Sequence, residues 1–110
     1  YAGALPTWLS PIQARILTIS ERSDAFAREV EAALRKDGLR AECDLRNEKI
    51  GFKVREAQLE KIPFMLVMGD REAEERTLTV RNRKGDNVGT MPFEQAVAMI
   101  KKANDDKVID

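Results

Sequence analysis

Short apolar runs, and runs in which hydrophobic and polar residues alternate, predict five β-strands along the chain. The predicted strands are Ala14–Ile19, Ala41–Leu45, Phe64–Met68, Leu78–Arg83 and Val88–Met91. Phe64–Met68 is apolar throughout, which is typical of a central strand with both faces covered. The turn Lys84–Asn87 contains a glycine, so we expect the last two strands to form a hairpin.

Three further segments have apolar residues at helical spacing. In the first, these residues recur at i, i+4, i+7 and i+8, and they are Phe26, Val30, Ala33 and Leu34. Ser23 or Asp24 can cap the start of this helix, and Gly38 stands where a helix commonly ends. The first helix is therefore predicted to bury one face.

The second predicted helix precedes the strand at 64–68, and Pro63 ends it. One face of it carries Ile50, Val54, Ala57 and Lys61, and another carries Lys49, Lys53, Glu56 and Glu60. Pro92 opens the third helix, because its missing N–H costs nothing there. The apolar stripe of the third helix consists of Phe93, Val97 and Ile100.

The element order β-α-β-α-β-β-β-α predicts an α/β domain with a mostly parallel sheet and helices on both faces. In open sheets of this kind, ligands bind outside the carboxyl ends of the strands. Those ends lead here into Arg46–Asn47 and Gly69–Glu72.

Composition narrows the possible functions. The 110 residues correspond to one domain, and 43% hydrophobic with 35% charged residues is typical of a soluble globular protein. No apolar run approaches the roughly 20 residues of a membrane span, and no signal peptide is visible. Because the chain has one cysteine, Cys43, and no histidine, the sequence excludes a disulfide framework, Cys/His zinc sites and Ser-His-Asp or Cys-His catalysis. A Gly-rich phosphate loop is also absent.

The chain divides into three parts. Residues 1–12 contain Gly3, Pro6 and Pro11 and are predicted to be a linker that follows another domain, with Trp8 and Leu9 as its anchors. Residues 13–104 form the folded domain, and 105–110 form a polar tail. Since the chain begins with a tyrosine, we expect that it continues a longer polypeptide.

Three polar clusters are candidates for binding chemistry. Asn47 either caps the second helix or uses its amide to donate to and accept from a base edge. Glu72 either lies in a tight turn or accepts a hydrogen bond from a base. Arg81 either protects an edge strand or reads guanine through its planar fork, with Arg83 and Lys84 on phosphates. Phe52 could stack on a base, although a core role is the stronger expectation.

Charge sets a further condition on these clusters. The chain has 19 basic and 19 acidic side chains and no net charge. A non-specific nucleic-acid binder is normally basic overall. Any RNA contact of this chain is therefore predicted to be local and selective.

Four segments resemble a known family. The chain opens with YAGALPTWLSPIQ, and DLRNEKIGFKVRE, IPFMLVMGDRE and VRNRKGDNVG follow in order. These segments look like the C-terminal anticodon-binding domain of bacterial threonyl-tRNA synthetases and the junction that precedes it. The resemblance covers nearly the whole chain, and DLRNEKIGFK is its most specific piece. Related domains of prolyl-, histidyl- and glycyl-tRNA synthetases share this string less closely.

The resemblance implies a three-layer α/β/α fold, with three main helices and a five-stranded mixed sheet in the order 2-1-3-4-5. It implies binding to the anticodon of threonine tRNA, whose second and third letters are G and U. Asn47, Glu72 and Arg81 match base-reading positions of the family. Lys61 replaces a family arginine, which keeps the charge and loses the planar fork. Weaker candidates, chiefly for the RNA backbone, are Glu48, Lys49, Lys53, Arg83 and Lys84.

The resemblance also places ATP, Mg, Zn and threonine in a catalytic domain that would precede this chain. We therefore expect the chain itself to be non-catalytic and monomeric, within a cytoplasmic, homodimeric parent enzyme. Two alternatives remain from the residues: an anticodon-binding-like fold used as a protein-interaction or accessory module, and a flavodoxin-like domain that binds a small molecule. The second would need a phosphate loop after the first strand, where only Ser20–Ser23 stands.

Overall fold

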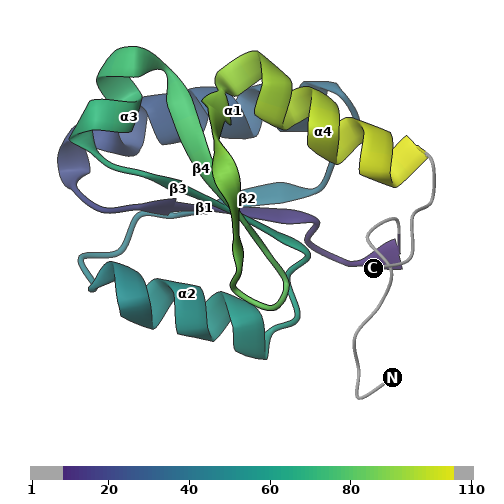
Figure 1. Ribbon diagram of the computed structural model, residues 1–110, viewed down its shortest axis with the longest axis horizontal. Coiled ribbons are helices and arrows are strands. Elements are labelled where there is room, and N and C mark those ends of the chain that lie inside the picture. The colour runs from purple at the N-terminus through teal and green to yellow at the C-terminus, as the bar shows by residue number, and fades with distance from the viewer. Residues whose placement is uncertain (1–8, 106–110) are drawn as a thin grey trace.

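The computed structural model describes residues 9–105 (Figure 1). Its elements are β1 (Ala14–Thr18), the short 3-10 helix η2 (Glu21–Ser23), α1 (Asp24–Lys36), β2 (Ala41–Asp44), α2 (Ile50–Leu59), β3 (Phe64–Met68), α3 (Asp70–Glu75), β4 (Thr77–Asn82), β5 (Asn87–Pro92) and α4 (Phe93–Asp105). Trp8, most of the predicted linker and nearly all of the predicted tail lie outside the described residues. Leu9 is described and is 49% exposed, so it is not a buried anchor. Among residues 9–105, no helix combines the length and apolar character that crossing a bilayer requires.

The sheet has five strands in the order β2-β1-β3-β4-β5. β1 runs parallel to both β2 and β3, whereas β4 is antiparallel to β3 and β5 is antiparallel to β4. The expected mixed sheet and its strand order are therefore confirmed. The three parallel strands place their carboxyl ends at one edge of the sheet, and the antiparallel β4 begins at that same edge.

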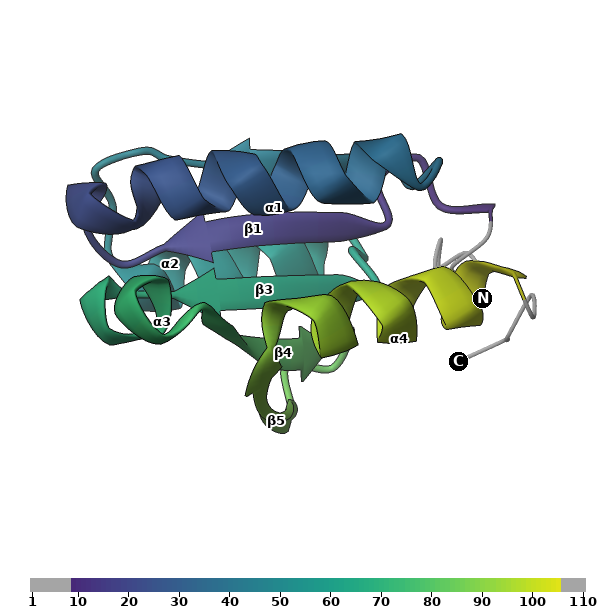
Figure 2. The ribbon, with the colours of Figure 1, turned by 90° about the horizontal axis from the view of Figure 1, so that it is seen from above.

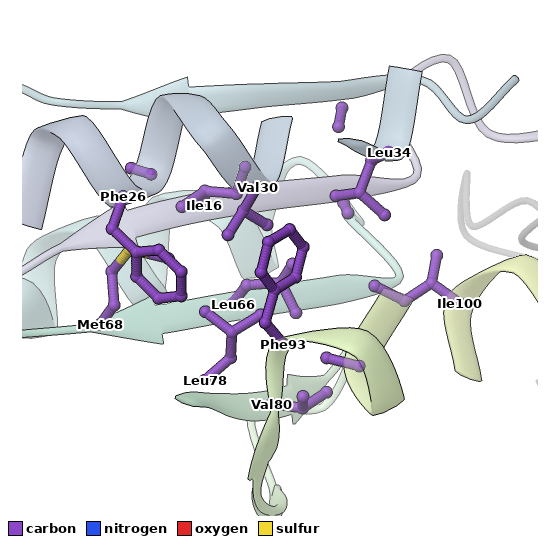
Figure 3. Packing of buried hydrophobic residues seen from close by; sticks show 14 of the residues in the cluster. Ile16, Phe26, Val30, Leu34, Leu66, Met68, Leu78, Val80, Phe93 and Ile100 are labelled. Atoms are coloured by element: carbon purple, nitrogen blue, oxygen red, sulfur yellow. The ribbon is translucent and has the colours of Figure 1, made fainter. Parts of the chain in front are cut away.

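Helices cover both faces of the sheet. α1 and α4 lie on one face and α2 lies on the other (Figures 1 and 2). The face under α1 and α4 holds the larger core, in which the rings of Phe26 and Phe93 meet edge to face with centroids 5.7 Å apart (Figure 3). The core under α2 is smaller, and its buried members are Leu17, Ala57, Ile62, Met65 and Val67.

The predicted boundaries of α1 hold, although the expected cap does not form. Ser23 precedes the helix and makes no side-chain cap bond. Its hydroxyl instead donates to the carbonyl of Ser20 at 2.8 Å. Gly38 ends the helix with φ +82°, a left-handed conformation that glycine adopts without a steric penalty.

The structure corrects two expectations about helices. A short fourth helix, α3, occupies the segment after β3 where a tight turn was expected. It has no buried residue, so it leaves no apolar periodicity in the sequence. In α2, Lys53 is buried beside Ala57 and does not share a solvated face with Lys49. Lys61 lies beyond the end of α2 and has φ +62°.

Candidate nucleic-acid interface

The loop between β2 and α2 presents Asn47, Glu48 and Lys49 to solvent. Helix α2 is preceded by Lys49 in extended conformation, and no side chain caps its start. The interpretation of Asn47 as a helix cap is therefore wrong. Within the described residues the Asn47 amide has no hydrogen-bond partner, so both its donor and its acceptor face outward.

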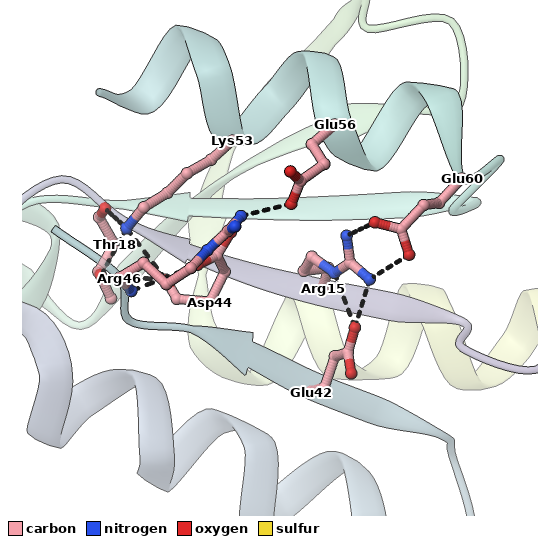
Figure 4. A network of polar contacts seen from close by, with 8 residues as sticks. All are labelled: Arg15, Thr18, Glu42, Asp44, Arg46, Lys53, Glu56 and Glu60. Atoms are coloured by element: carbon pink, nitrogen blue, oxygen red, sulfur yellow. Dashed lines mark hydrogen bonds and ion pairs between the residues drawn. The ribbon is translucent and has the colours of Figure 1, made fainter. Parts of the chain in front are cut away.

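Arg46 holds this loop against the domain (Figure 4). Its Nε donates to Oδ1 of Asp44 and its Nη2 to Oδ2, both at 2.8 Å, and Nη2 also pairs with Glu56 on α2. The hydrogen bond from Arg46 lowers the pKa of Asp44, and the two carboxylates raise the pKa of Arg46. A bidentate pair of this kind fixes direction as well as distance, so the loop is oriented before any ligand arrives.

The buried side chain of Lys53, on α2, contacts the base of the same loop from the core side. Its side chain is 1% exposed, and Nζ donates to the carbonyl oxygens of Thr18 at 2.8 Å and Asp44 at 3.1 Å. These carbonyls stand at the carboxyl ends of β1 and β2, so the buried ammonium joins the two strands where the chain turns into the loop (Figure 4). The expectation that Lys53 contacts an RNA backbone does not fit this placement, because the ammonium is enclosed by protein.

A second arginine bridges the sheet and α2 further along. Arg15 on β1 pairs with Glu42 on β2 and with Glu60 just after α2, the latter through Nη1 at 2.7 Å and Nη2 at 2.8 Å. This bond lowers the pKa of Glu60. A cleft of about 240 Å³ lies along these ion pairs, between the β2 edge and α2.

Glu72 lies at the same end of the sheet as Asn47. It belongs to α3, which follows the carboxyl end of β3 directly. The side chain is half-buried, and within residues 9–105 its carboxylate has no hydrogen-bonded or ionic partner. Because β1, β2 and β3 are parallel, their carboxyl ends bring the loop of Asn47 and the helix of Glu72 to one edge.

Arg81 lies at the opposite end. It pairs across the antiparallel ladder with Met65, near the start of β3. Leu78 and Val80 pack in the larger core, so Arg81 points toward the face that α2 covers. Its Nη1 donates to the carbonyl of Gly85 at 2.7 Å, which ties the side chain to the β4–β5 turn.

The β4–β5 turn also meets the end of α2. Gln58 Nε2 donates to the carbonyl of Lys84 at 2.8 Å. Lys61 follows α2 by two residues and is exposed, and Arg83 in the turn is half-buried. This end of the domain therefore gathers Lys61, Arg81 and Lys84 around Gln58.

The predicted site residues thus form two groups, Asn47 with Glu72 and Lys61 with Arg81. They are separated by the length of α2, ten residues or about 15 Å. The structure does not bring the four into one pocket. A ligand that touches all of them must span at least about the length of α2.

Phe52 is a surface residue, although its hydrophobic character predicted a place in the core. Its side chain is 47% exposed on the outer side of α2, and the Arg46 guanidinium lies 5.6 Å from its ring centroid. The signal was present in the sequence, because Phe52 falls two positions from both Ile50 and Val54 and so lies off their apolar face.

Known proteins resemble this chain over most of its length. The family model described as the anticodon binding domain matches residues 13–103. The threonine–tRNA ligase of Oleidesulfovibrio alaskensis is 55% identical over 101 residues, which cover 92% of this chain and 16% of that protein. The threonine–tRNA ligase of Clostridium novyi is 50% identical over 107 residues, covering 97% and 17%. The chain therefore spans about one sixth of the length of these relatives.

Solved structures agree with the sequence matches. The RNA-binding domain of threonyl-tRNA synthetase from Cryptosporidium parvum superposes with a TM-score of 0.86 at 34% identity, over 92% of this chain and 26% of that one. A prolyl-tRNA synthetase from the same organism superposes with a TM-score of 0.82 at 25% identity, over 94% and 22%. This chain belongs to the anticodon-binding domain family, of the type found in threonyl-tRNA synthetases.

Proposed function

We propose that this chain binds the anticodon loop of threonine tRNA and reads G and U at its second and third positions. The parent enzyme would then charge that tRNA with threonine, using ATP. The observation that carries the proposal is identity of 50–55% with threonine–tRNA ligases over at least nine-tenths of the chain.

The chemistry of the candidate site residues supports base reading. The Asn47 amide can donate to and accept from one base edge. The Glu72 carboxylate can accept from a base amino or imino group, and the Arg81 fork suits the two acceptors of guanine. Lys61 supplies a charge without a fork, so it suits a single acceptor or a phosphate.

The separation of the two groups fits an extended, single-stranded ligand. Sequence-specific RNA recognition targets loops whose bases are splayed apart. A loop lying along α2 would meet Asn47 and Glu72 at one end and Lys61 and Arg81 at the other. Lys49, Arg83 and Lys84 would contact phosphates, and Glu48, whose carboxylate repels phosphates, would accept from a ribose hydroxyl.

In this proposal, cofactor binding and dimerisation of the parent enzyme take place outside this chain. ATP, Mg and Zn would bind in a catalytic domain of the same polypeptide, and that domain would also form the homodimer. The described residues of this chain hold no group of three His, Cys, Asp or Glu placed to share a metal ion. The chain alone would be a cytoplasmic monomer that binds RNA weakly, since it lacks the avidity of linked sites.

The test is an amide chemical-shift titration of the labelled chain with a threonine anticodon stem-loop at low salt. A second stem-loop, with the G and U replaced, is the control. We expect the threonine loop alone to shift signals at Asn47, Glu72 and Arg81. An equal response to both loops would reduce the chain to a backbone binder, and no response at millimolar RNA would favour a protein-interaction role.

A further inference from the structure

The ring of Phe52 is exposed where the other phenylalanines are not. Of the four in the chain, Phe26 and Phe93 are buried in the larger core, and Phe64 packs against it. Phe52 is 47% exposed and belongs to neither core. Single exposed apolar side chains are common on protein surfaces, so the case for a ligand at this ring rests on the groups that surround it.

Arg46 supports the ring from the loop side. Its guanidinium lies 5.6 Å from the ring centroid of Phe52, within the range of a cation–π contact. Asp44 and Glu56 hold the guanidinium in place (Figure 4). These two carboxylates also neutralise it, so Arg46 serves to orient the ring and is not a free cation for a phosphate.

Two exposed cations bracket the ring. Lys49 precedes Phe52 by three positions and Arg55 follows it by three, so both are its neighbours on the helix surface. Asn47, whose amide has no hydrogen-bond partner among residues 9–105, lies in the loop two positions before Lys49. An aromatic face flanked by cations, beside a group able to pair with a base, matches the chemistry of an unstacked nucleotide.

We infer that Phe52 is a stacking platform for an unpaired base of the anticodon loop, with Arg46 as the residue that positions its ring. This inference rests on the proposed function and adds to it a contact that does not discriminate among the four bases. Every base has a π-face, so stacking supplies affinity without selecting among bases. Asn47 and Arg81 would supply the selection.

The test compares two variants of the same helix face, Phe52→Ala and Leu59→Ala. Leu59 is a matched control because it is also apolar, is 75% exposed, and lies seven positions further along α2. Affinity for the threonine stem-loop and for the loop with G and U replaced is measured by titration, and thermal unfolding checks that both variants fold. We expect Phe52→Ala to weaken binding of both loops about fivefold or more, by the same factor. Leu59→Ala should leave both affinities unchanged.

A second readout detects the contact itself. In a Trp8→Phe background, which removes the only native tryptophan, Phe52→Trp places a fluorophore at the platform. Quenching of its emission on addition of the stem-loop is expected if a base stacks there. The inference would be overturned if Phe52→Ala bound the stem-loop as tightly as the unsubstituted chain and Phe52→Trp showed no quenching.

The outcomes separate this inference from the proposed function. If Arg81→Ala and Asn47→Ala lose selectivity while Phe52→Ala binds normally, anticodon reading stands and the stacking platform is wrong. A change of selectivity in Phe52→Ala would also contradict the platform, since stacking does not choose among bases. If the unsubstituted chain binds neither loop, both proposals fail together.

Discussion

The Nζ atom of Lys53 lies 2.8 Å from the carbonyl oxygen of Thr18, so a side chain of α2 closes the carboxyl end of β1. The contact is fully buried, and the Asp44 carbonyl shares the same ammonium. Charge on the inner face of a helix is costly unless it is fully hydrogen-bonded. Here the acceptors are the carbonyl oxygens at the ends of β1 and β2, and the loop that contains Asn47 follows β2.

Replacing Lys53 with methionine should destabilise the domain. The variant keeps the apolar stem and removes the donor that the Thr18 and Asp44 carbonyls share. We expect a loss of about 1–3 kcal/mol in the free energy of unfolding, the usual cost of leaving buried polar groups unpaired. Urea unfolding measures it, with Lys49→Met as the exposed control. Equal stability of the two variants would show that the buried ammonium contributes nothing.

Acid should weaken the domain through its arginine-bound carboxylates. Arg46 lowers the pKa of Asp44, and Arg15 lowers the pKa of Glu60. A depressed folded-state pKa adds stability above the unfolded pKa, and that stability is lost as pH falls through the folded value. We therefore expect the free energy of unfolding to be level near neutrality and to fall below about pH 4–5.

The variant Arg46→Met should make this acid loss shallower, because the Asp44 pKa then returns toward its ordinary range. Urea unfolding across a pH series measures the slope. Arg22→Met is the control, since Arg22 Nη1 lies 3.6 Å from Oδ2 of Asp70 and both side chains are exposed, by 85% and 49% respectively. Parallel pH profiles for Arg46→Met and the unsubstituted chain would contradict the assignment.

Two glycines should respond oppositely to substitution by alanine. Gly85 has φ +88°, and a Cβ there would lie 2.5 Å from Nε2 of Gln58. Gly85→Ala should cost about 1–2 kcal/mol for the left-handed backbone alone. Gly51, in α2, has nothing within 4 Å of its Cβ position, so Gly51→Ala should stabilise by about 0.5–1 kcal/mol. Thermal unfolding of the pair tests both signs, and a shift in the same direction would refute the account of the turn.

Arg81 should govern selectivity for the central G. Arg81→Ala is expected to relax discrimination against the replaced loop by about 1–3 kcal/mol, and Arg81→Lys should restore charge without restoring the fork. Arg28→Ala, which removes an exposed cation from α1 on the opposite face of the sheet, is the control. Titration with the two stem-loops gives the discrimination directly. Unchanged selectivity in Arg81→Ala would remove this residue from the proposed base readers.

Most of the fold could be predicted because its strands and long helices repeat an apolar period. Phe64–Met68 is apolar because helices cover both of its faces, and the sheet order followed from the family resemblance. Helix α3 could not be found in this way, since it buries no residue. The prediction that Lys53 lies on a solvated face was wrong because it relied on the charge of the side chain. Its burial is explained by the carbonyls of Thr18 and Asp44, which accept hydrogen bonds from Nζ.

The site was harder to predict than the fold. The residue types of Asn47, Glu72 and Arg81 indicate what each can bind, and their spacing in the chain says nothing of their separation. That separation comes from β4, which runs antiparallel and carries Arg81 back to the end where β3 begins. The exposure of Phe52 could have been predicted by giving helical periodicity more weight than hydrophobic character.

The position of β1 has a consequence for how the chain is made. It is the first described strand and lies inside the sheet between β2 and β3, where Ile16 pairs with Cys43 on one side and Leu66 on the other. A ribosome therefore releases β1 before either of its neighbouring strands exists. The nascent strand stays unpaired until residues through Asp44 have emerged, and its second edge stays open until Met68 follows. Translation must deliver more than half of the domain before its most buried strand is protected.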